Sequence, residues 1–434
     1  MTAESPARAP EWLSAGAPHV WRPYCQMKTA PPPLPVAATR GSRLVLADGR
    51  ELVDGIASWW TACHGYNHPH IAAAVREQLE RMPHVMFGGL AHEPASRLAR
   101  RLADLLPGDL NHAFFAESGS VSVEIAMKMA LQFHINRGEH GRTRFLSFRG
   151  GYHGDTLATM TVCDPEEGMH SLFSGVMPSQ VIADLPVDAA SEAVLEALLV
   201  ERGGEIAAIV TEPLVQGAGG MLFHDPEVLR RLRRTADRHG VLLIFDEIFT
   251  GFGRTGSLFA MEAAGIEPDI VTLSKALTGG TLPLSVAVAS TRVFQAFWSD
   301  DAGAALMHGP TYMANPLACA AANASLDLFE DGAWRADVAR VSAALAQGLE
   351  PLRGAPGVVD VRVLGAIGVV EFAAPVAVGA LCQAFAAEGA WIRPMGKTVY
   401  LAPAFNTPDA DLAVLTSAMR RVLGAGGVEG SGGV

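Results

Sequence analysis

The chain has 434 residues, of which 49% are hydrophobic and 18% charged, and its formal net charge is -12. This length allows two or three domains with a sizeable core, and the acidic balance argues against nucleic acid as the main partner. No apolar run approaches the roughly 18 residues that a membrane-spanning helix needs. Chemistry that needs an amine has few places in this chain, because its lysines are only Lys28, Lys128, Lys275 and Lys397.

The five cysteines are scattered and form no C-x-x-C pair, which is typical of free thiols in a reducing compartment. The N-terminal stretch has no basic segment followed by an apolar one, so we expect no secretory signal and a cytoplasmic protein. Histidines at 64, 68 and 70 stand close together, but Gly65 and Pro69 interrupt any helix there and no carboxylate or thiol is near. We therefore predict no metal site.

The predicted elements begin with a β-hairpin, because RLVLADGRELVDG alternates around the Asp48–Gly49 turn. From about residue 65, helical patterns alternate with short apolar strands, which indicates a parallel sheet covered by helices. After about residue 325, an Ala-rich helix leads into short strands and further helices. We predict an α/β fold in which 65–325 is a large domain, 326–434 is a smaller α+β domain, and 1–64 joins the small domain.

Two helices of the large domain have clear sequence signals. In DPEVLRRLRRTADRHG, Asp225 is the expected N-cap, Pro226 takes the first helical position and a glycine follows the end. The stripe in VSVEIAMKMALQFH predicts a helix from Val121, with Lys128 paired to Glu124 on its solvated side.

Charged residues follow three apolar strands of this domain. Asp246 and Glu247 end VLLIF, Glu212 ends IAAIVT, and Ser274 and Lys275 end IVTL. Open parallel sheets bind ligands beyond the carboxyl ends of their strands. Pyridoxal 5′-phosphate (PLP) needs a lysine to hold its aldehyde as a Schiff base and an aspartate to keep its pyridine nitrogen protonated. Asp246 and Lys275 are candidates for these roles, and a buried ion pair between them is the alternative.

A turn of small residues, ESGS at 117–120, precedes the helix expected from Val121. Its backbone N–H groups and hydroxyls suit a phosphate at a helix N-terminus, although an ordinary serine N-cap is the alternative.

The run Gly251–Gly256 matches the G-x-G-x-x-G pattern of dinucleotide-binding units, so an NAD-dependent oxidoreductase is the rival interpretation. The preceding strand ends in the acids Asp246 and Glu247, which would face the pyrophosphate, and no long helix follows the glycines. We therefore favour PLP.

With these residues in place, the chain resembles the class III aminotransferases of PLP fold type I, from about Trp21 to about Leu423. DEIFTGFGRTG and VTLSKALTGG match that class in order and spacing. Further segments narrow the resemblance to a branch that acts in biotin biosynthesis with S-adenosylmethionine as amino donor, with lysine or another ω-amine as the alternative donor. These segments are WRPYCQM, ASWWTACHGYNHP, HVMFGGLAHEPA, RGGYHGDT, EPLVQGAGGM, HGPTYMANPLACAAA and WIRPMGKTVYLAPAF.

The resemblance implies a role for each matching residue. Lys275 would hold the cofactor and then shuttle a proton, and Asp246 would pair with the pyridine nitrogen. Tyr152 would lie against the cofactor ring, and Gly119 and Ser120 would hold the phosphate.

The resemblance also implies a homodimer with active sites at the subunit interface, in which Pro310 and Thr311 of the other subunit join the phosphate site. Arg393 would grip a substrate carboxylate through two hydrogen bonds, and the flat rings of Tyr24 and Trp59 suit a donor that carries adenine. The full expected substrate site is Tyr24, Trp59, Tyr152, Lys275, Gly309 and Arg393.

Overall fold

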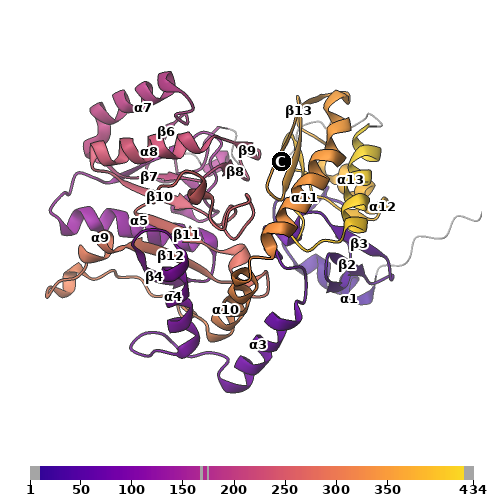
Figure 1. Ribbon diagram of the computed structural model, residues 1–434, viewed down its shortest axis with the longest axis horizontal. Helices are drawn as coiled ribbons and strands as arrows, with labels where there is room; N and C mark the ends of the chain where they lie inside the picture. Colours follow the sequence, from indigo (N-terminus) through magenta and orange to yellow (C-terminus); the bar gives the residue numbers. More distant parts are fainter. Residues whose placement is uncertain (1–9, 167–169, 174, 425–434) are drawn as a thin grey trace, which may run out of the picture. The chain divides into compact units, whose positions relative to one another are not determined.

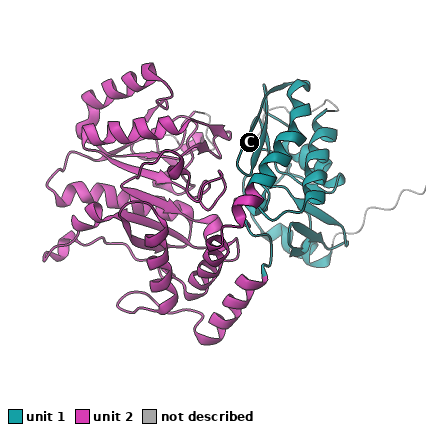
Figure 2. Cartoon of the chain, viewed as in Figure 1, with its two compact units in different colours: residues 1–59, 63–68, 339–434 teal, residues 60–62, 69–338 magenta. Residues whose placement is uncertain are grey.

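The computed structural model describes residues 10–166, 170–173 and 175–424. The chain divides into two compact units (Figure 2). Unit 1 comprises residues 1–59, 63–68 and 339–434, and unit 2 comprises residues 60–62 and 69–338. Within the described ranges, no helix has the length and apolar character that crossing a membrane requires.

Unit 2 is built on a seven-stranded sheet with the order β4-β12-β11-β10-β7-β5-β6 (Figure 1). All its neighbouring strands pair in parallel except β12, which runs antiparallel to both β11 and β4. The strands are β4 (Leu110–Ala116), β5 (Arg144–Phe148), β6 (Val181–Ala183), β7 (Ile206–Thr211), β10 (Leu242–Asp246), β11 (Ile270–Leu273) and β12 (Ser285–Ser290). The predicted α/β class with a mostly parallel sheet is confirmed.

Helices cover both faces of this sheet, as the continuous burial of its central strands requires. Figure 1 shows α7 and α8 on one side and α5 on the other. The main core lies between α5 and the sheet, where Ile125 and Phe133 of the helix belong to one buried cluster with Ile244 and Ile270. The helices of unit 2 are α3 (Pro69–Arg81), α4 (Glu93–Leu105), α5 (Gly119–Asn136), α6 (Leu157–Met160), α7 (Ala189–Arg202), α8 (Pro226–His239), α9 (Thr291–Gln295) and α10 (Pro316–Glu330), and a small hairpin joins β8 (Val215–Gln216) to β9 (Leu222–Phe223).

The ends of α8 agree with the prediction, because Asp225 caps the Glu227 N–H and Gly240 follows the helix with a φ of 62°. The predicted start of α5 at Val121 is wrong by two residues. The side chain of Ser118 accepts the Val121 N–H, so the helix begins at Gly119.

Unit 1 contains two smaller sheets, with orders β1-β2-β3-β15 and β13-β14-β16. The predicted hairpin is present, since β2 and β3 pair antiparallel around Asp48–Gly49, and β15 from the far end of the chain adds to β3 in parallel. The strands are β1 (Val36–Arg40), β2 (Arg43–Leu46), β3 (Glu51–Asp54), β13 (Val358–Leu364), β14 (Ile367–Phe372), β15 (Ala390–Trp391) and β16 (Thr398–Leu401). The helices are α1 (Glu11–Gly16), α12 (Val378–Ala387) and α13 (Asp409–Gly424), and α11 (Trp334–Leu349) starts in unit 2 and ends in unit 1.

A left-handed turn, Ala57–Trp60 (α2), follows β3. The φ angles of its four residues are 46°, 50°, 54° and 73°, and none of the four is glycine. The left-handed conformation costs a residue with a side chain roughly 1–2 kcal/mol. Such strain persists only where the surroundings enforce it, and it gathers at functional sites.

Candidate active site

Lys275 lies at the carboxyl end of β11, as predicted, and its φ of 48° is in the left-handed region. Its Nζ is 4.4 Å from the centroid of the Trp60 ring and 5.9 Å from that of Phe249. Burial lowers the pKa of the Lys275 ammonium to about 8, against the charges of Asp246 and Glu212, which favour protonation. An amine with this pKa is available as a nucleophile much more often than an exposed lysine.

Asp246 is the last residue of β10, opposite Thr272 of β11, and only 5% of it is exposed. Its Oδ2 lies 2.9 Å from His153 Nδ1, its Oδ1 accepts the Ile248 N–H at 3.1 Å, and the Thr272 hydroxyl donates to Oδ1 at 3.4 Å. No salt bridge joins Asp246 to Lys275 in the described part of the chain. The ion-pair alternative is therefore not what the geometry shows.

His153 is a buried residue of this site that the sequence analysis did not single out. Burial disfavours its charged form, but the hydrogen bond with Asp246 and the charges of Asp246 and Glu212 raise the pKa of His153 above its usual value. It follows Tyr152 in RGGYHGDT, in the loop after β5. Its position in a loop at the ligand-binding edge of the sheet could have marked His153 as a candidate site residue, but the sequence does not reveal which way its ring points.

Glu212, at the end of β7, holds the same loop. Its Oε2 accepts the Tyr152 N–H at 3.0 Å and its Oε1 accepts the Gly217 N–H at 2.9 Å. Burial raises the pKa of Glu212 to about 7, although His153 and the two backbone donors oppose this shift. The carboxylate thus fixes the backbone that carries Tyr152.

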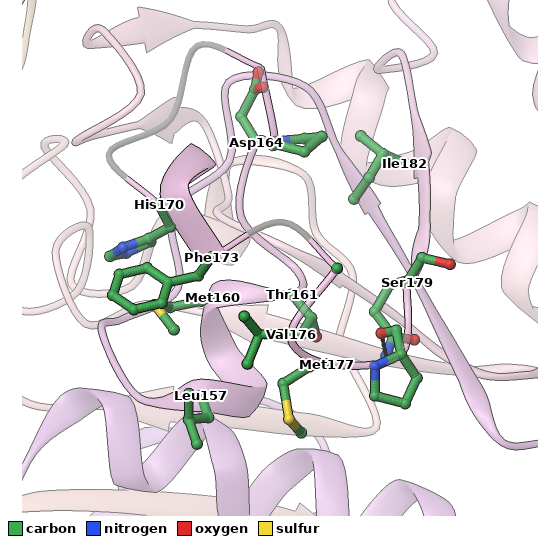
Figure 3. Close-up of a pocket in the computed structure, with 14 residues that line it drawn as sticks. Leu157, Met160, Thr161, Asp164, His170, Phe173, Val176, Met177, Ser179 and Ile182 are labelled. Atoms are coloured by element: carbon green, nitrogen blue, oxygen red, sulfur yellow. Dashed lines mark hydrogen bonds between the residues drawn. The ribbon is translucent and has the colours of Figure 1, made fainter.

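An apolar cavity borders the Tyr152 loop. The Tyr152 hydroxyl donates to Asp155 at 2.8 Å, and its ring lies 6.0 Å from the ring of His170 at an interplanar angle of 23°. His170 also lines a cavity of about 170 Å³ beside α6 (Figure 3). Its apolar lining comes mainly from Leu157, Met160, Phe173, Val176, Met177 and Ile182.

The first turn of α5 is open to an anion. The backbone N–H groups of Gly119 and Ser120 make no hydrogen bond within the described residues, since the cap of Ser118 reaches a later residue. The Ser120 hydroxyl accepts the Asp155 N–H at 3.1 Å. A Cβ on Gly119 would lie 3.0 Å from the Ile248 side chain, so glycine fits here best. Open N–H groups at the positive end of a long helix suit a phosphate.

The loop that carries Gly309, Pro310 and Thr311 precedes α10, and Gly309 and Thr311 are exposed. In the described ranges no hydrogen bond connects this loop to Gly119 or Ser120 of the same chain. The structure therefore does not join the two expected phosphate-binding segments within one chain.

The predicted pairing of Lys128 with Glu124 is wrong. Lys128 Nζ donates to the Met307 carbonyl at 2.9 Å and lies 3.2 Å from His308 Nδ1, whereas Glu124 accepts a backbone N–H from α6. Lys128 thus anchors the segment that leads into Gly309.

Three expected substrate residues come together in unit 1. The Arg393 guanidinium carbon lies 5.3 Å from the Trp59 ring centroid, and the rings of Tyr24 and Trp59 meet edge to face at 5.9 Å. Trp59 is 37% exposed. A guanidinium held over an indole keeps its planar N–H fork available for a carboxylate.

The glycine run does not form a dinucleotide site. Gly251–Gly256 is a series of turns, and the next helical segment is the short 3-10 stretch Ala260–Ala263. Glu247 faces this loop and accepts the N–H groups of Ala260 and Met261, both at 2.8 Å, and burial raises its pKa to about 7. A carboxylate in that position would repel a pyrophosphate.

The residues gathered in unit 2 fit PLP. They are an enclosed amine and a buried carboxylate at adjacent strand ends, with an open helix N-terminus for a phosphate. No other described lysine stands at a strand end of this sheet.

Comparison with known proteins agrees with this geometry. A family model described as aminotransferase class-III matches residues 24–423. A Mycobacterium leprae protein named adenosylmethionine-8-amino-7-oxononanoate aminotransferase is 48% identical, over 98% of this chain and 99% of its own. A Corynebacterium glutamicum protein of the same name is 46% identical, over 92% of this chain and 96% of its own.

Solved structures give the same result. The structure of adenosylmethionine-8-amino-7-oxononanoate aminotransferase from Methanocaldococcus jannaschii has a TM-score of 0.90 at 28% identity and covers 94% of this chain and 98% of its own. An amine transaminase from an uncultivated Pseudomonas species, in a PLP-bound form, has a TM-score of 0.86 at 31% identity and covers 94% of this chain and 99% of its own. The chain therefore belongs to the class III aminotransferases and is a PLP-dependent enzyme of fold type I.

Proposed function

We propose that this enzyme transfers an amino group from S-adenosylmethionine to 8-amino-7-oxononanoate and forms 7,8-diaminononanoate in biotin biosynthesis. The observation that carries the proposal is the 48% identity, along nearly the whole of both chains, with the M. leprae protein whose name states this donor and acceptor. The reaction exchanges an amine for a ketone oxygen. The donor leaves as a 2-oxo acid whose carbonyl oxygen comes from water, and the acceptor's ketone oxygen leaves as water.

Asp246 and His153 support the electronic part of this chemistry. When bound, PLP supplies an aldehyde for the amine and a protonated pyridine ring that withdraws electrons from the substrate α-carbon. Asp246 would keep the proton on that ring nitrogen. His153, 2.9 Å from Asp246 Oδ2, and the Ile248 N–H orient that carboxylate.

Lys275 would hold PLP through its amine. When that amine is free, Nζ would take the proton from the substrate α-carbon and deliver it to the aldehyde carbon of the cofactor. With a pKa of about 8, roughly one in ten of these amines is neutral at pH 7, a far larger fraction than for an exposed lysine. The Trp60 ring, 4.4 Å away, stabilises the ammonium form when it arises.

Gly119 and Ser120 bind the phosphate through their open backbone N–H groups. Tyr152 would lie against the cofactor ring, and the hydrogen bond from its N–H to Glu212 fixes its backbone. Arg393 binds a substrate carboxylate, while Trp59 and Tyr24 provide flat apolar surfaces for the adenine and the alkyl chain.

We also propose a homodimer in which Gly309, Pro310 and Thr311 serve the partner's site. Large apolar side chains are exposed around this loop. The ring contact between His84 and Tyr312, 4.7 Å between centroids, places the segments 83–92 and 306–312 side by side. The exposed fractions are 57% for Met86, 51% for Leu90, 80% for Met307 and 57% for Tyr312. Such a surface favours burial against a second copy.

Mixing two inactive variants tests the dimer. Lys275→Ala lacks the amine, and Thr311→Arg blocks the phosphate site of its partner. A mixed dimer has one intact site, so refolding the two variants together restores part of the activity. Absence of recovery, with mixed dimers present, contradicts a shared site.

The donor is tested by supplying the holoenzyme and 8-amino-7-oxononanoate with S-adenosylmethionine or with lysine, and by measuring 7,8-diaminononanoate. We expect product with S-adenosylmethionine. Product with lysine alone would replace the proposed donor, and no product with either would refute the proposed acceptor.

A cytoplasmic location is also proposed, because all five cysteines are free thiols. Cell fractionation with antibodies against the chain tests it, and recovery outside the cytoplasm would contradict it.

A further inference from the structure

Trp59 and Trp60 are neighbours in the chain, but they belong to different units and contact different charged side chains. Trp59 lies over the Arg393 guanidinium in unit 1, at 5.3 Å, and Trp60 lies over the Lys275 amine in unit 2, at 4.4 Å. Trp60 also packs on Phe249, with 4.1 Å between ring centroids. Both side chains stand on the left-handed turn Ala57–Trp60.

The Asp54 carboxylate binds the backbone of this turn. It is the last residue of β3 and 2% exposed. Its Oδ1 accepts the Ile56 N–H at 2.9 Å, and its Oδ2 accepts the Ser58 N–H at 2.8 Å. One carboxylate thus binds backbone donors on both sides of the point where the chain enters the left-handed conformation.

Tyr66 completes the arrangement. The Tyr66 hydroxyl donates to Asp54 Oδ2 at 2.6 Å, and the Tyr66 hydroxyl oxygen also lies 2.8 Å from Ser58 Oγ. Burial and the nearby carboxylate raise the pKa of Tyr66 well above its usual value, so the phenol keeps its proton. The roles proposed above for the site residues do not include Asp54 or Tyr66.

Arg393 lies two residues after β15, the strand that pairs with β3. β15 pairs in parallel with β3, so that Trp391 lies opposite Asp54 and its carbonyl accepts the Gly55 N–H at 2.9 Å. The turn after β3 and the segment after β15 therefore leave the sheet side by side, and this brings Trp59 to Arg393.

We propose that Asp54 and Tyr66 are positioning residues that hold the strained turn in unit 1, so that Trp59 is aligned with Arg393. They act through Trp59. The inference about substrate binding rests on the proposed function, whereas the inference about the geometry of the turn does not.

The test uses Tyr66→Phe and Asp54→Asn in the full-length holoenzyme, with Asp411→Asn as the matched control. Asp411 is also a buried carboxylate of unit 1, 4% exposed, and it accepts hydrogen bonds from Ser42 and Arg43. We expect Tyr66→Phe to lower kcat/KM on the order of tenfold, mainly through KM, because a small misplacement of positioning groups has effects of this size or larger. The tryptophan bands in the near-ultraviolet circular dichroism of the cofactor-free protein should change with it, and they are read apart from the tyrosine bands, which the substitution alters by itself. Asp411→Asn should lower Tm but leave KM and the dichroism spectrum as in the wild type.

Rescue by glycine separates positioning from general destabilisation. Glycine adopts positive φ without strain, and Ser58 is exposed. Adding Ser58→Gly to Tyr66→Phe should therefore recover most of the lost kcat/KM, although glycine normally weakens a folded chain. The same change added to Asp411→Asn should recover none of its lost Tm.

Wild-type KM and tryptophan dichroism in Tyr66→Phe, or no rescue by Ser58→Gly, would overturn the inference. If Asp54→Asn does not fold, Tyr66→Phe decides alone. If the wild-type enzyme transaminates other substrates but not the proposed pair, the proposed function fails while the dichroism and the rescue, measured with the accepted substrate, still test the turn.

Discussion

The two compact units hold their functional groups in contrasting ways. In unit 2, Asp246 and Lys275 stand at the ends of regular parallel strands, where the topology alone brings them to one edge. In unit 1, Trp59 stands on a left-handed turn that its own residues disfavour and that Asp54 enforces. In unit 2, burial and charge determine the protonation of the functional groups. In unit 1, a strained backbone determines the orientation of a side chain. Substitutions in unit 2 should therefore mainly lower kcat, and substitutions in unit 1 should mainly raise KM.

The largest effect is expected at Lys275. Lys275→Ala removes both the attachment point and the proton shuttle, so turnover should fall at least about a thousandfold, since a positioned acid–base group alone contributes 10²–10⁴. The visible absorbance of the cofactor bound to the amine should disappear. Steady-state kinetics and the spectrum check this, with Lys397→Ala as the control, and full activity would refute the assignment.

Asp246→Asn is expected to have the next largest effect. It keeps the shape of the side chain but removes the charge, so kcat should fall on the order of a hundredfold or more, as when other electrostatic stabilisation is lost. The protein should remain folded, because the asparagine Oδ1 can still accept the Ile248 N–H. Wild-type kcat together with a large loss of Tm would instead show a purely structural carboxylate.

A smaller and more selective loss is expected at Arg393 in unit 1. Arg393→Lys keeps the charge but loses the planar fork, and a hydrogen bond to a charged group is worth about 1.5–3 kcal/mol, so KM for carboxylate substrates should rise roughly tenfold or more. Amine substrates without a carboxylate should be unaffected. Arg421→Lys is the control, because Arg421 is exposed and paired with Glu388. Equal losses with both kinds of substrate would argue against a carboxylate grip.

The smallest expected effect concerns pH. The Lys275 pKa of about 8 in the free enzyme means that the neutral amine becomes about tenfold scarcer for each pH unit below 8. The rate of PLP uptake by the cofactor-free enzyme should follow this curve. Asp246 favours the ammonium form, so Asp246→Asn should move the midpoint to lower pH.

Stopped-flow absorbance, with a free lysine derivative as the reference amine, measures this rate. A midpoint near that of free lysine would contradict the enclosed amine, and a shift to higher pH in Asp246→Asn would contradict the sign.

The sequence was sufficient for those parts of the fold that local rules control. The ends of α8 follow from Asp225 and Gly240, and the apolar strands β10 and β11 place Asp246 and Lys275 at one edge. These residues could be predicted because the carboxyl ends of parallel strands lie at the same edge of a sheet, whatever segments connect the strands.

Other features depend on distant contacts and were not predictable. Lys128 reaches a carbonyl of residue 307 instead of its helical neighbour, and His153 meets Asp246 across the sheet edge. Ala-Ser-Trp-Trp contains no glycine, so nothing local indicates a left-handed turn at 57–60. That turn is enforced by Asp54 and Tyr66, and Tyr66 lies in a later segment of the chain.

The most direct test of the whole account is to identify the residue that holds the cofactor. Borohydride reduces the C=N bond between an amine and bound PLP to a stable C–N bond, and peptide mass spectrometry then locates the adduct. The chain offers four lysines, and the structure predicts a single stoichiometric adduct on Lys275. An adduct on Lys28, Lys128 or Lys397, with Lys275 unmodified, would contradict it.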